Sequence, residues 1–122
     1  MRDKPLAGRR VMLVEDDYYL ASDASEAVQS AGGEIVGPFA NAEEASRALS
    51  GGEADVAVID INLGHGPSFD LARELRSAAV PFLFATGYAR SAIPEDLSAV
   101  PRLEKPFTAG QLIHCLTAAT RC

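Results

Sequence analysis

At 122 residues, 48% of them hydrophobic, the chain is long enough for one domain with a sizeable core. Its formal charge of −6 and its scattered basic residues argue against a general nucleic-acid-binding surface. No apolar run approaches the length of a membrane-spanning helix, and residues 1–5 do not resemble a signal peptide. We therefore expect a cytoplasmic protein with neither a nucleic-acid nor a membrane partner.

Apolar runs and helical spacing alternate along the first half of the chain. The pattern predicts strands at residues 10–14, 35–37 and 55–60, and helices at residues 18–31 and 41–50. Leu20 is expected on the buried face of the first helix. Asn41 opens the second helix and Glu44 follows three residues on, which is typical of an N-cap. The run at residues 55–60 is apolar almost throughout and predicts a strand buried on both faces.

The second half continues this alternation less regularly. The pattern predicts helices at residues 69–79 and 108–119, and strands at residues 81–85 and 102–104. Residues 63–68 contain glycines and a proline and are expected to form a loop. Residues 89–100 have poor periodicity and are interrupted by Pro94, so we expect one or two helical turns there. Thr108 and Gln111 predict a capping box for the last helix.

Strand and helix thus alternate five times, and the connections have the length of crossover helices. This organisation predicts an α/β fold with a doubly wound, five-stranded parallel sheet, helices on both faces and a short or irregular fourth helix. No internal repeat or linker suggests a second domain. We expect residues 1–8 to form a flexible N-terminal tail and residues 9–122 to form the domain.

Polar side chains follow the predicted strands, and the carboxyl ends of parallel strands meet at one edge of a sheet. The first strand delivers Glu15 and Asp16, the third delivers Asp60 and Asn62, and the fourth delivers Thr86. Carboxylates this close repel each other unless a cation lies among them. Because all the candidate ligands are oxygen donors, the set suits a hard cation such as Mg²⁺.

Lys105, at the end of the fifth strand, completes this set. Of the 11 basic residues only Lys4 and Lys105 are lysines, and Lys105 faces the acids. A compact ammonium group can pair with a bound oxygen anion, and the hydroxyl of Thr86 can donate to the same anion. A carboxylate nucleophile at Asp60, a metal and fixed donors are the parts needed to form an acyl phosphate.

The acids and Thr86, with Lys105 and the two residues after it, resemble the flavodoxin-like receiver domain of two-component response regulators over residues 9–119. The resemblance implies a phosphoprotein of a two-component phosphorelay that is not itself an enzyme. Such a protein accepts a phosphoryl group on Asp60 from a phosphohistidine of a sensor histidine kinase. It then signals through contacts with a downstream protein, which the sequence does not identify, and its oligomeric state is left open.

The resemblance also assigns roles to the residues at the strand ends. It implies Mg²⁺ as the cofactor, with a ligand set of Asp16, Glu15 through water, Asp60 and the backbone carbonyl of Asn62. Thr86 and Lys105 would contact the phosphoryl group, so Asp60, Thr86 and Lys105 are the expected catalytic residues. The peptide bond between Lys105 and Pro106 is expected to be cis.

The chain departs from the common receiver pattern in its loops. Residues 63–66 replace the usual proline and Asp-Gly pair, and Arg102 occupies the place of the family's switch aromatic, three residues before Lys105. Residues 84–88, Phe-Ala-Thr-Gly-Tyr, resemble a subgroup of α-proteobacterial single-domain receivers whose kinases are often of the HWE type. Tyr88 in this pentapeptide is the nearest replacement for the missing aromatic.

Two other functions remain open from the residues alone. A phosphate sink or shuttle would use the same acceptor without an output of its own. A phosphatase of the haloacid-dehalogenase type would also use an aspartate nucleophile with Mg²⁺. That chemistry calls for a second aspartate two residues after the nucleophile, where this chain has Asn62.

Overall fold

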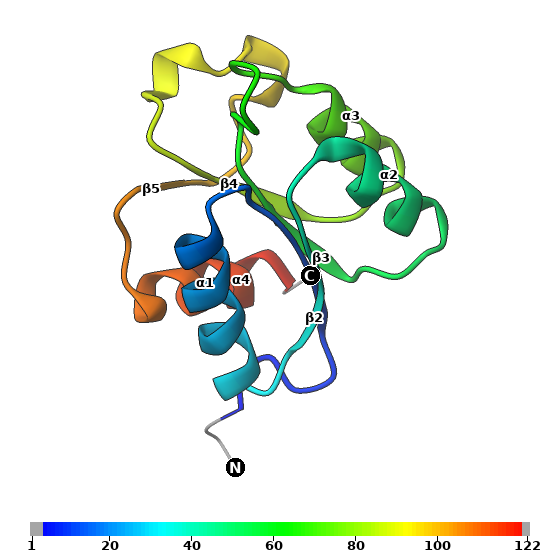
Figure 1. The fold of residues 1–122 in the computed structure, drawn as a ribbon, viewed down its shortest axis with the longest axis vertical. Helices are drawn as coiled ribbons and strands as arrows, with labels where there is room; N and C mark the ends of the chain where they lie inside the picture. Colours follow the sequence, from blue (N-terminus) through cyan, green and yellow to red (C-terminus); the bar gives the residue numbers. More distant parts are fainter. Residues whose placement is uncertain (1–3, 121–122) are drawn as a thin grey trace.

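The computed structural model describes residues 4–120 and contains one parallel five-stranded sheet in the order β2–β1–β3–β4–β5. The strands are β1 (Arg10–Val14), β2 (Glu34–Phe39), β3 (Val56–Ile59), β4 (Phe82–Thr86) and β5 (Arg102–Glu104). The helices are α1 (Tyr18–Ser30), α2 (Ala42–Ser50), α3 (Asp70–Ser77) and α4 (Ala109–Thr120). Helices α1 and α4 cover one face of the sheet and α2 and α3 the other (Figure 1). The predicted doubly wound α/β fold is confirmed.

The sheet divides the core into two layers, because successive side chains of a strand point to opposite faces. On β3, Val56 and Val58 pack toward α1 and α4, whereas Ala57 and Ile59 pack toward α2 and α3. All four residues are buried, as predicted for a central strand. Both faces of β3 are therefore covered, and this packing fixes the position of Asp60, the residue that follows the strand.

The connection between β4 and β5 carries two short 3₁₀ turns in place of a helix, η1 (Arg90–Ala92) and η2 (Glu95–Leu97). The expectation of one or two helical turns here is confirmed. Leu97 is fully buried in the layer beneath α2 and α3, and Ile93 is nearly so. The guanidinium groups of Arg73 and Arg76 on α3 both bind the carboxylate of Asp96.

Side-chain caps begin three of the helices, and those of α2 and α4 are the ones that the sequence indicated. Asp17 accepts hydrogen bonds from the backbone N–H groups of the first turn of α1, and Asn41 accepts one from Glu44. Thr108 and Gln111 bond each other reciprocally before α4, as in a capping box. The expectation for Leu20 is wrong. The residue is 36% exposed, because it lines an open groove between α1 and α4 and is not covered by the core.

Residues 4–8 were expected to belong to a flexible tail, but they pack on the domain. Leu6 is fully buried among α1 and β1 side chains, and its N–H donates to the carbonyl of Ala31. The ammonium group of Lys4 donates to the carbonyl of Ser30. The burial of Leu6 and the two hydrogen bonds together hold the segment against the domain, and a single leucine among residues 1–8 gives no periodicity that would predict this. Residues 1–3 of the expected tail lie outside the described part.

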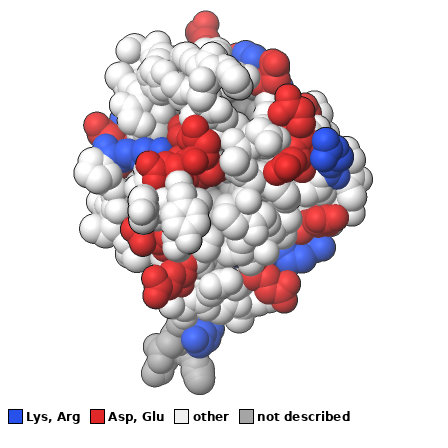
Figure 2. Space-filling view, viewed as in Figure 1, with Lys and Arg blue, Asp and Glu red and all other residues white. Residues whose placement is uncertain are grey.

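Acidic side chains predominate on the face seen in Figure 2, and the basic ones are isolated among them. This agrees with the formal charge of −6. Among residues 4–120, no helix has the length and apolar character needed to cross a bilayer.

Candidate functional site

The pairing of β1 with β3 brings the first two acids together. Val14 lies opposite Ile59, and the N–H of Asp60 donates to the carbonyl of Val14. The residues that follow these strands, Glu15 and Asp60, therefore leave the sheet side by side. Glu15 is almost completely buried, and the side chain of Asp60 is only 9% exposed. Register and burial thus fix two carboxylates at one edge of the sheet.

Lys105 reaches both carboxylates from the end of β5. Its ammonium nitrogen is 2.7 Å from Oε1 of Glu15 and 3.0 Å from Oδ2 of Asp60. The N–H of Lys105 donates to the carbonyl of Thr86, so β4 places the lysine. The peptide bond from Lys105 to Pro106 is cis, as the sequence predicted. One cation is thereby shared by two acids.

The surroundings of this cluster change the acidity of two of its members. Burial raises the pKa of Glu15 above its ordinary value, and the charge of Asp60 adds to this, although hydrogen bonds from Lys105 and the Asp17 N–H act in the opposite direction. Burial works against the charge of Lys105. Hydrogen bonds to Glu15 and Asp60 and the charges of both outweigh it and raise the pKa of the lysine. Lys105 is therefore held as a permanent cation.

The same edge of the sheet offers a set of ligands for a metal ion. One carboxylate oxygen from each of Glu15, Asp16 and Asp60 lies within 4.8 Å of the other two. Glu15 is buried and Asp16 is exposed, so the group opens toward solvent on the side of Asp16. A set made only of oxygen donors, open to water, fits Mg²⁺, which binds few carboxylates and keeps several waters. The residues present therefore fit the expected cofactor.

Thr86 and Tyr88 form the opposite wall of the pocket. Thr86 is fully buried, and its hydroxyl oxygen accepts the N–H of Tyr88 at 3.0 Å, which closes a tight turn after β4. The hydroxyl of Tyr88 accepts a hydrogen bond from the side-chain amide of Asn62, also at 3.0 Å. The carbonyl of Tyr88 accepts one from the guanidinium of Arg102 at 2.9 Å. Tyr88 is thus held at three points.

Asn62 also shapes the loop that replaces the common receiver sequence. Its side-chain oxygen accepts the N–H groups of Gly64 and Gly66, at 2.8 and 3.1 Å. Both glycines have positive φ, 102° and 85°, a conformation that side chains with a Cβ rarely adopt. The loop therefore closes around Asn62. The backbone N–H of Asn62 donates to Oδ1 of Asp60 at 3.2 Å, and this hydrogen bond links the loop to Asp60.

These residues line a pocket of about 460 Å³, formed by Asp16, Asp60, Asn62, Gly64, Thr86, Gly87, Tyr88 and Lys105. Every site residue expected from the sequence lies in this pocket or, for Glu15, directly behind it. Sequence reasoning missed the side-chain roles of Asn62 and Arg102. A long arginine at a partly buried strand, 14 residues from its acceptor, carries no local sequence signal.

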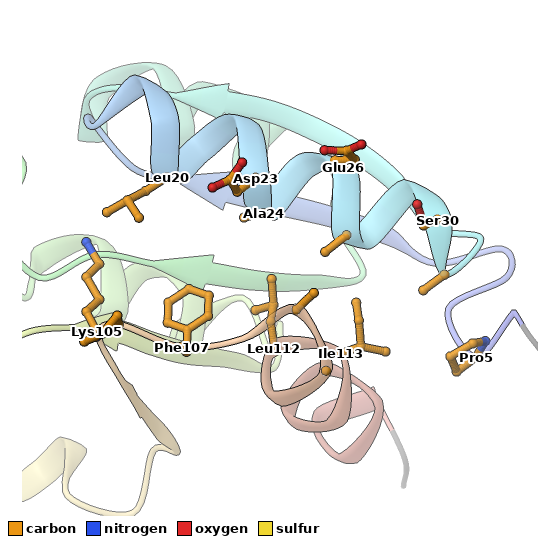
Figure 3. Close-up of a pocket in the computed structure, with 15 residues that line it drawn as sticks. Pro5, Leu20, Asp23, Ala24, Glu26, Ser30, Lys105, Phe107, Leu112 and Ile113 are labelled. Atoms are coloured by element: carbon orange, nitrogen blue, oxygen red, sulfur yellow. The ribbon is translucent and has the colours of Figure 1, made fainter.

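A second, larger groove of about 760 Å³ runs between α1 and α4 beside the pocket. Figure 3 shows Lys105 and Leu20 at one end, Pro5 at the other, and Phe107 with Leu112 along its floor. In the first turn of α1, next in the chain to Leu20, Tyr18 and Tyr19 are 75% and 77% exposed and contact each other edge to face. Exposed aromatic groups beside an apolar groove are typical of a protein interface.

Comparisons with known proteins agree with this arrangement. The family model described as "Response regulator receiver domain" matches residues 11–117, so the chain belongs to the response regulator receiver domain family. The transcriptional regulatory protein PdtaR of Mycobacterium tuberculosis is 28% identical over 91% of this chain, which spans 56% of that protein. The sensor kinase CckA of Brucella abortus is 35% identical over 84% of the chain, which spans 11% of that protein.

Solved structures show the same fold. The BeF3-activated conformation of SdrG from Pseudomonas melonis Fr1 has a TM-score of 0.81 and 28% identity. The match covers 94% of this chain and 98% of the SdrG chain. The response regulator PhyR from Brucella abortus has a TM-score of 0.78 and 26% identity, with 98% of this chain and 51% of PhyR covered.

Proposed function

We propose that the chain is a phosphoacceptor of a two-component system, which receives a phosphoryl group on Asp60 and signals through protein contacts. The observation that carries this proposal is the Lys105 ammonium between Glu15 and Asp60, within a pocket that also holds Asp16 and Thr86. The membership of the chain in the receiver family supports it. We propose that the domain itself turns over no substrate beyond gaining and slowly losing its own phosphoryl group.

The chemistry follows from what each side chain can do. A carboxylate oxygen of Asp60 attacks the phosphorus of the donor. The bond from phosphorus to the imidazole nitrogen of a phosphohistidine breaks, and its electron pair stays on the imidazole, which then binds a proton. The Lys105 ammonium and the Thr86 hydroxyl are both hydrogen-bond donors, and we propose that they stabilise charge on the transferred oxygens. Mg²⁺ would be held by Glu15, Asp16, Asp60 and Asn62 and would neutralise negative charge on the phosphoryl oxygens when bound.

The surface beside the pocket supports a protein as the phosphoryl donor. The donor must bring its phosphorus to Asp60, and the groove between α1 and α4 begins at Lys105, at the rim of that pocket. Tyr18 and Tyr19 add exposed aromatic surface in the first turn of α1, next in the chain to Leu20 of the groove. We propose a sensor histidine kinase as the donor. Since such kinases phosphorylate their partners inside the cell, we also propose that the chain acts in the cytoplasm.

A more specific assignment is to the subgroup marked by the pentapeptide at residues 84–88. The likeness to SdrG, which extends over nearly all of both chains, supports it. We propose on this ground that the donor is a histidine kinase of the HWE type.

Phosphorylation of the purified chain tests the proposal. Incubation with acetyl phosphate and Mg²⁺ is expected to add one phosphoryl group, measured by intact-mass spectrometry, because Asp60 is the nucleophile at a pocket with fixed donors. A phosphorylated HWE-type kinase domain is the second donor. Asp60→Asn should abolish labelling by both donors. Asp55→Asn is the matched control, since Asp55 precedes β3 and binds Arg10 at the far end of the strand. Labelling of Asp60→Asn at the parent level would refute the assignment.

A further inference from the structure

Arg102 stands where the family's switch aromatic is expected, and it makes a hydrogen bond that a phenylalanine in that place could not make. Its guanidinium donates to the backbone carbonyl of Tyr88 at 2.9 Å. The side chain is only 13% exposed, and its carboxylate neighbour on the strand, Glu104, is 3.8 Å away on the solvent side. Among residues 4–120, Nε of Arg102 is one of two buried side-chain polar atoms without a hydrogen-bond partner. The Tyr88 carbonyl is therefore the principal anchor of this arginine.

Tyr88 in turn belongs to the wall of the acceptor pocket. Its ring is half-buried against the layer beneath α2 and α3, and its hydroxyl accepts from the side chain of Asn62. This hydrogen bond joins the loop after β4 to the loop after β3, which carries Asp60. The hydroxyl proton of Tyr88 remains available to donate into the pocket, because the bond with Asn62 uses the hydroxyl as an acceptor. Moving Tyr88 would open that wall to water.

We propose that Arg102 is a positioning residue that holds Tyr88 over the acceptor pocket and so prolongs the life of the aspartyl phosphate on Asp60. The inference rests on the proposed function. In hydrolysis, a water oxygen attacks the phosphorus, and the bond from phosphorus to the Asp60 oxygen breaks with its electron pair returning to the carboxylate. Inorganic phosphate leaves with the oxygen and both protons of the water. Tyr88 and Asn62 together restrict the approach of that water, and Arg102 fixes Tyr88 by its carbonyl.

The site contrasts with an ordinary surface arginine. A partly buried guanidinium has lost much of its hydration. Removing its hydrogen bond to a carbonyl therefore costs more free energy than it would for an arginine in solvent. The path from Arg102 to the pocket runs through one residue, Tyr88, which is bonded to Thr86 and Asn62 as well. If Arg102 acts only through Tyr88, removing the arginine must have no effect once the tyrosine is absent. A double-mutant cycle separates this from a general loss of packing.

The experiment measures how fast phosphorylated Asp60 loses its phosphoryl group. The full chain is labelled with acetyl phosphate and Mg²⁺, the donor is removed by gel filtration, and the labelled fraction is followed by mass spectrometry. We expect Arg102→Met to hydrolyse about three- to tenfold faster than the parent, the factor that corresponds to one lost hydrogen bond. Tyr88→Ala should be at least as fast. Arg102→Lys, which can still donate to the carbonyl, should return toward the parent rate.

The cycle and its controls decide the outcome. Arg102→Met in the Tyr88→Ala background should add no acceleration, and Arg47→Met, an exposed arginine on α2, should match the parent. Parent-like hydrolysis by Arg102→Met would overturn the inference, as would a full additional acceleration in the Tyr88→Ala background. Circular dichroism at the assay temperature verifies that each variant is folded. Failure of the parent to label at Asp60 would instead refute the proposed function.

Discussion

Two clusters in this molecule each place one charged side chain between two of the opposite sign, and the signs are reversed from one cluster to the other. In the pocket, the cation of Lys105 lies between the carboxylates of Glu15 and Asp60. On the surface, the carboxylate of Asp96 lies between the guanidinium groups of Arg73 and Arg76. The side chains of the first cluster are 19%, 7% and 9% exposed, whereas those of the second are 43–50% exposed.

Burial gives these similar arrangements different consequences. Charges near the surface attract each other weakly because water and salt screen them, whereas buried charges interact strongly but cost free energy to desolvate. The pocket keeps two buried carboxylates and one cation at that cost, which is the arrangement expected of a site selected for chemistry. The surface cluster joins η2 to α3 with little loss of hydration, and it contributes little to the free energy of unfolding.

The largest effect is expected from removing the cation of the buried cluster. Lys105→Met keeps the length of the side chain but leaves Glu15 and Asp60 facing each other and removes a fixed donor from the pocket. We expect the rate of phosphorylation by acetyl phosphate to fall about a hundred- to thousandfold, the usual result of losing one preorganised electrostatic donor. Stopped-time mass spectrometry with Mg²⁺ present measures the rate.

The control for this variant is the one other lysine of the chain, Lys4. Its ammonium group donates to the carbonyl of Ser30, away from the strand ends. Lys4→Met should be phosphorylated at the parent rate. If Lys105→Met were phosphorylated as fast as Lys4→Met, the buried cluster would have no part in the chemistry, and the contrast with the surface cluster would disappear.

An intermediate effect is expected where the segment between β4 and β5 is held by apolar packing. Leu97 is fully buried beneath α3, next to the surface cluster of Asp96. Leu97→Ala should lower the free energy of unfolding by about 2–4 kcal/mol, because it deletes buried methyl groups and leaves a cavity. Urea unfolding followed by circular dichroism gives the value. Leu20→Ala, at an exposed leucine, should change it little, and equal losses for the two variants would contradict the packing argument.

The sequence predicted most of the fold and much of the site, because both follow from rules that act over a few residues. A continuous apolar run marks β3, and the convergence of parallel strand ends brings Glu15, Asp60 and Lys105 together. The exposure of Leu20 escaped prediction, since helical spacing does not show where two neighbouring helices leave an open groove between them.

The contacts of Tyr88 escaped prediction for a different reason. The bond from Arg102 to its carbonyl spans 14 residues, and the bond from Asn62 to its hydroxyl spans 26. Both depend on the path of the two loops after β3 and β4. The positive φ values of the loop glycines and the packing of η2 on the core set that path. The spacing of hydrophobic residues in the sequence carries no information about either. The sequence thus predicted which residues gather in the pocket, but not the hydrogen bonds that form its wall.

The smallest effect is expected from the surface cluster, and pH reveals it. The pKa of Asp96 lies below its ordinary value, chiefly because Arg73 donates hydrogen bonds to its carboxylate. The positive charge of Arg73 and the hydrogen bond and charge of Arg76 lower the pKa further. The folded state therefore binds this proton less readily than the unfolded state. The resulting stabilisation is complete above the unfolded-state pKa and is lost as the pH falls through the lower folded-state pKa. Asp96→Asn should accordingly lower stability slightly at neutral pH, and the difference from the parent should vanish in acid.

Urea unfolding of parent and variant across the acidic range measures that difference, and carbon-13 titration of the Asp96 carboxyl gives its pKa directly. Asp23→Asn, at an exposed aspartate of α1, serves as the control and should show no such convergence. A large loss at neutral pH, or a difference that persists in acid, would mean that the surface cluster behaves like the buried one. Phosphorylation of Asp96→Asn should equal that of the parent, because Leu97 and Ile93 still anchor the segment through the core.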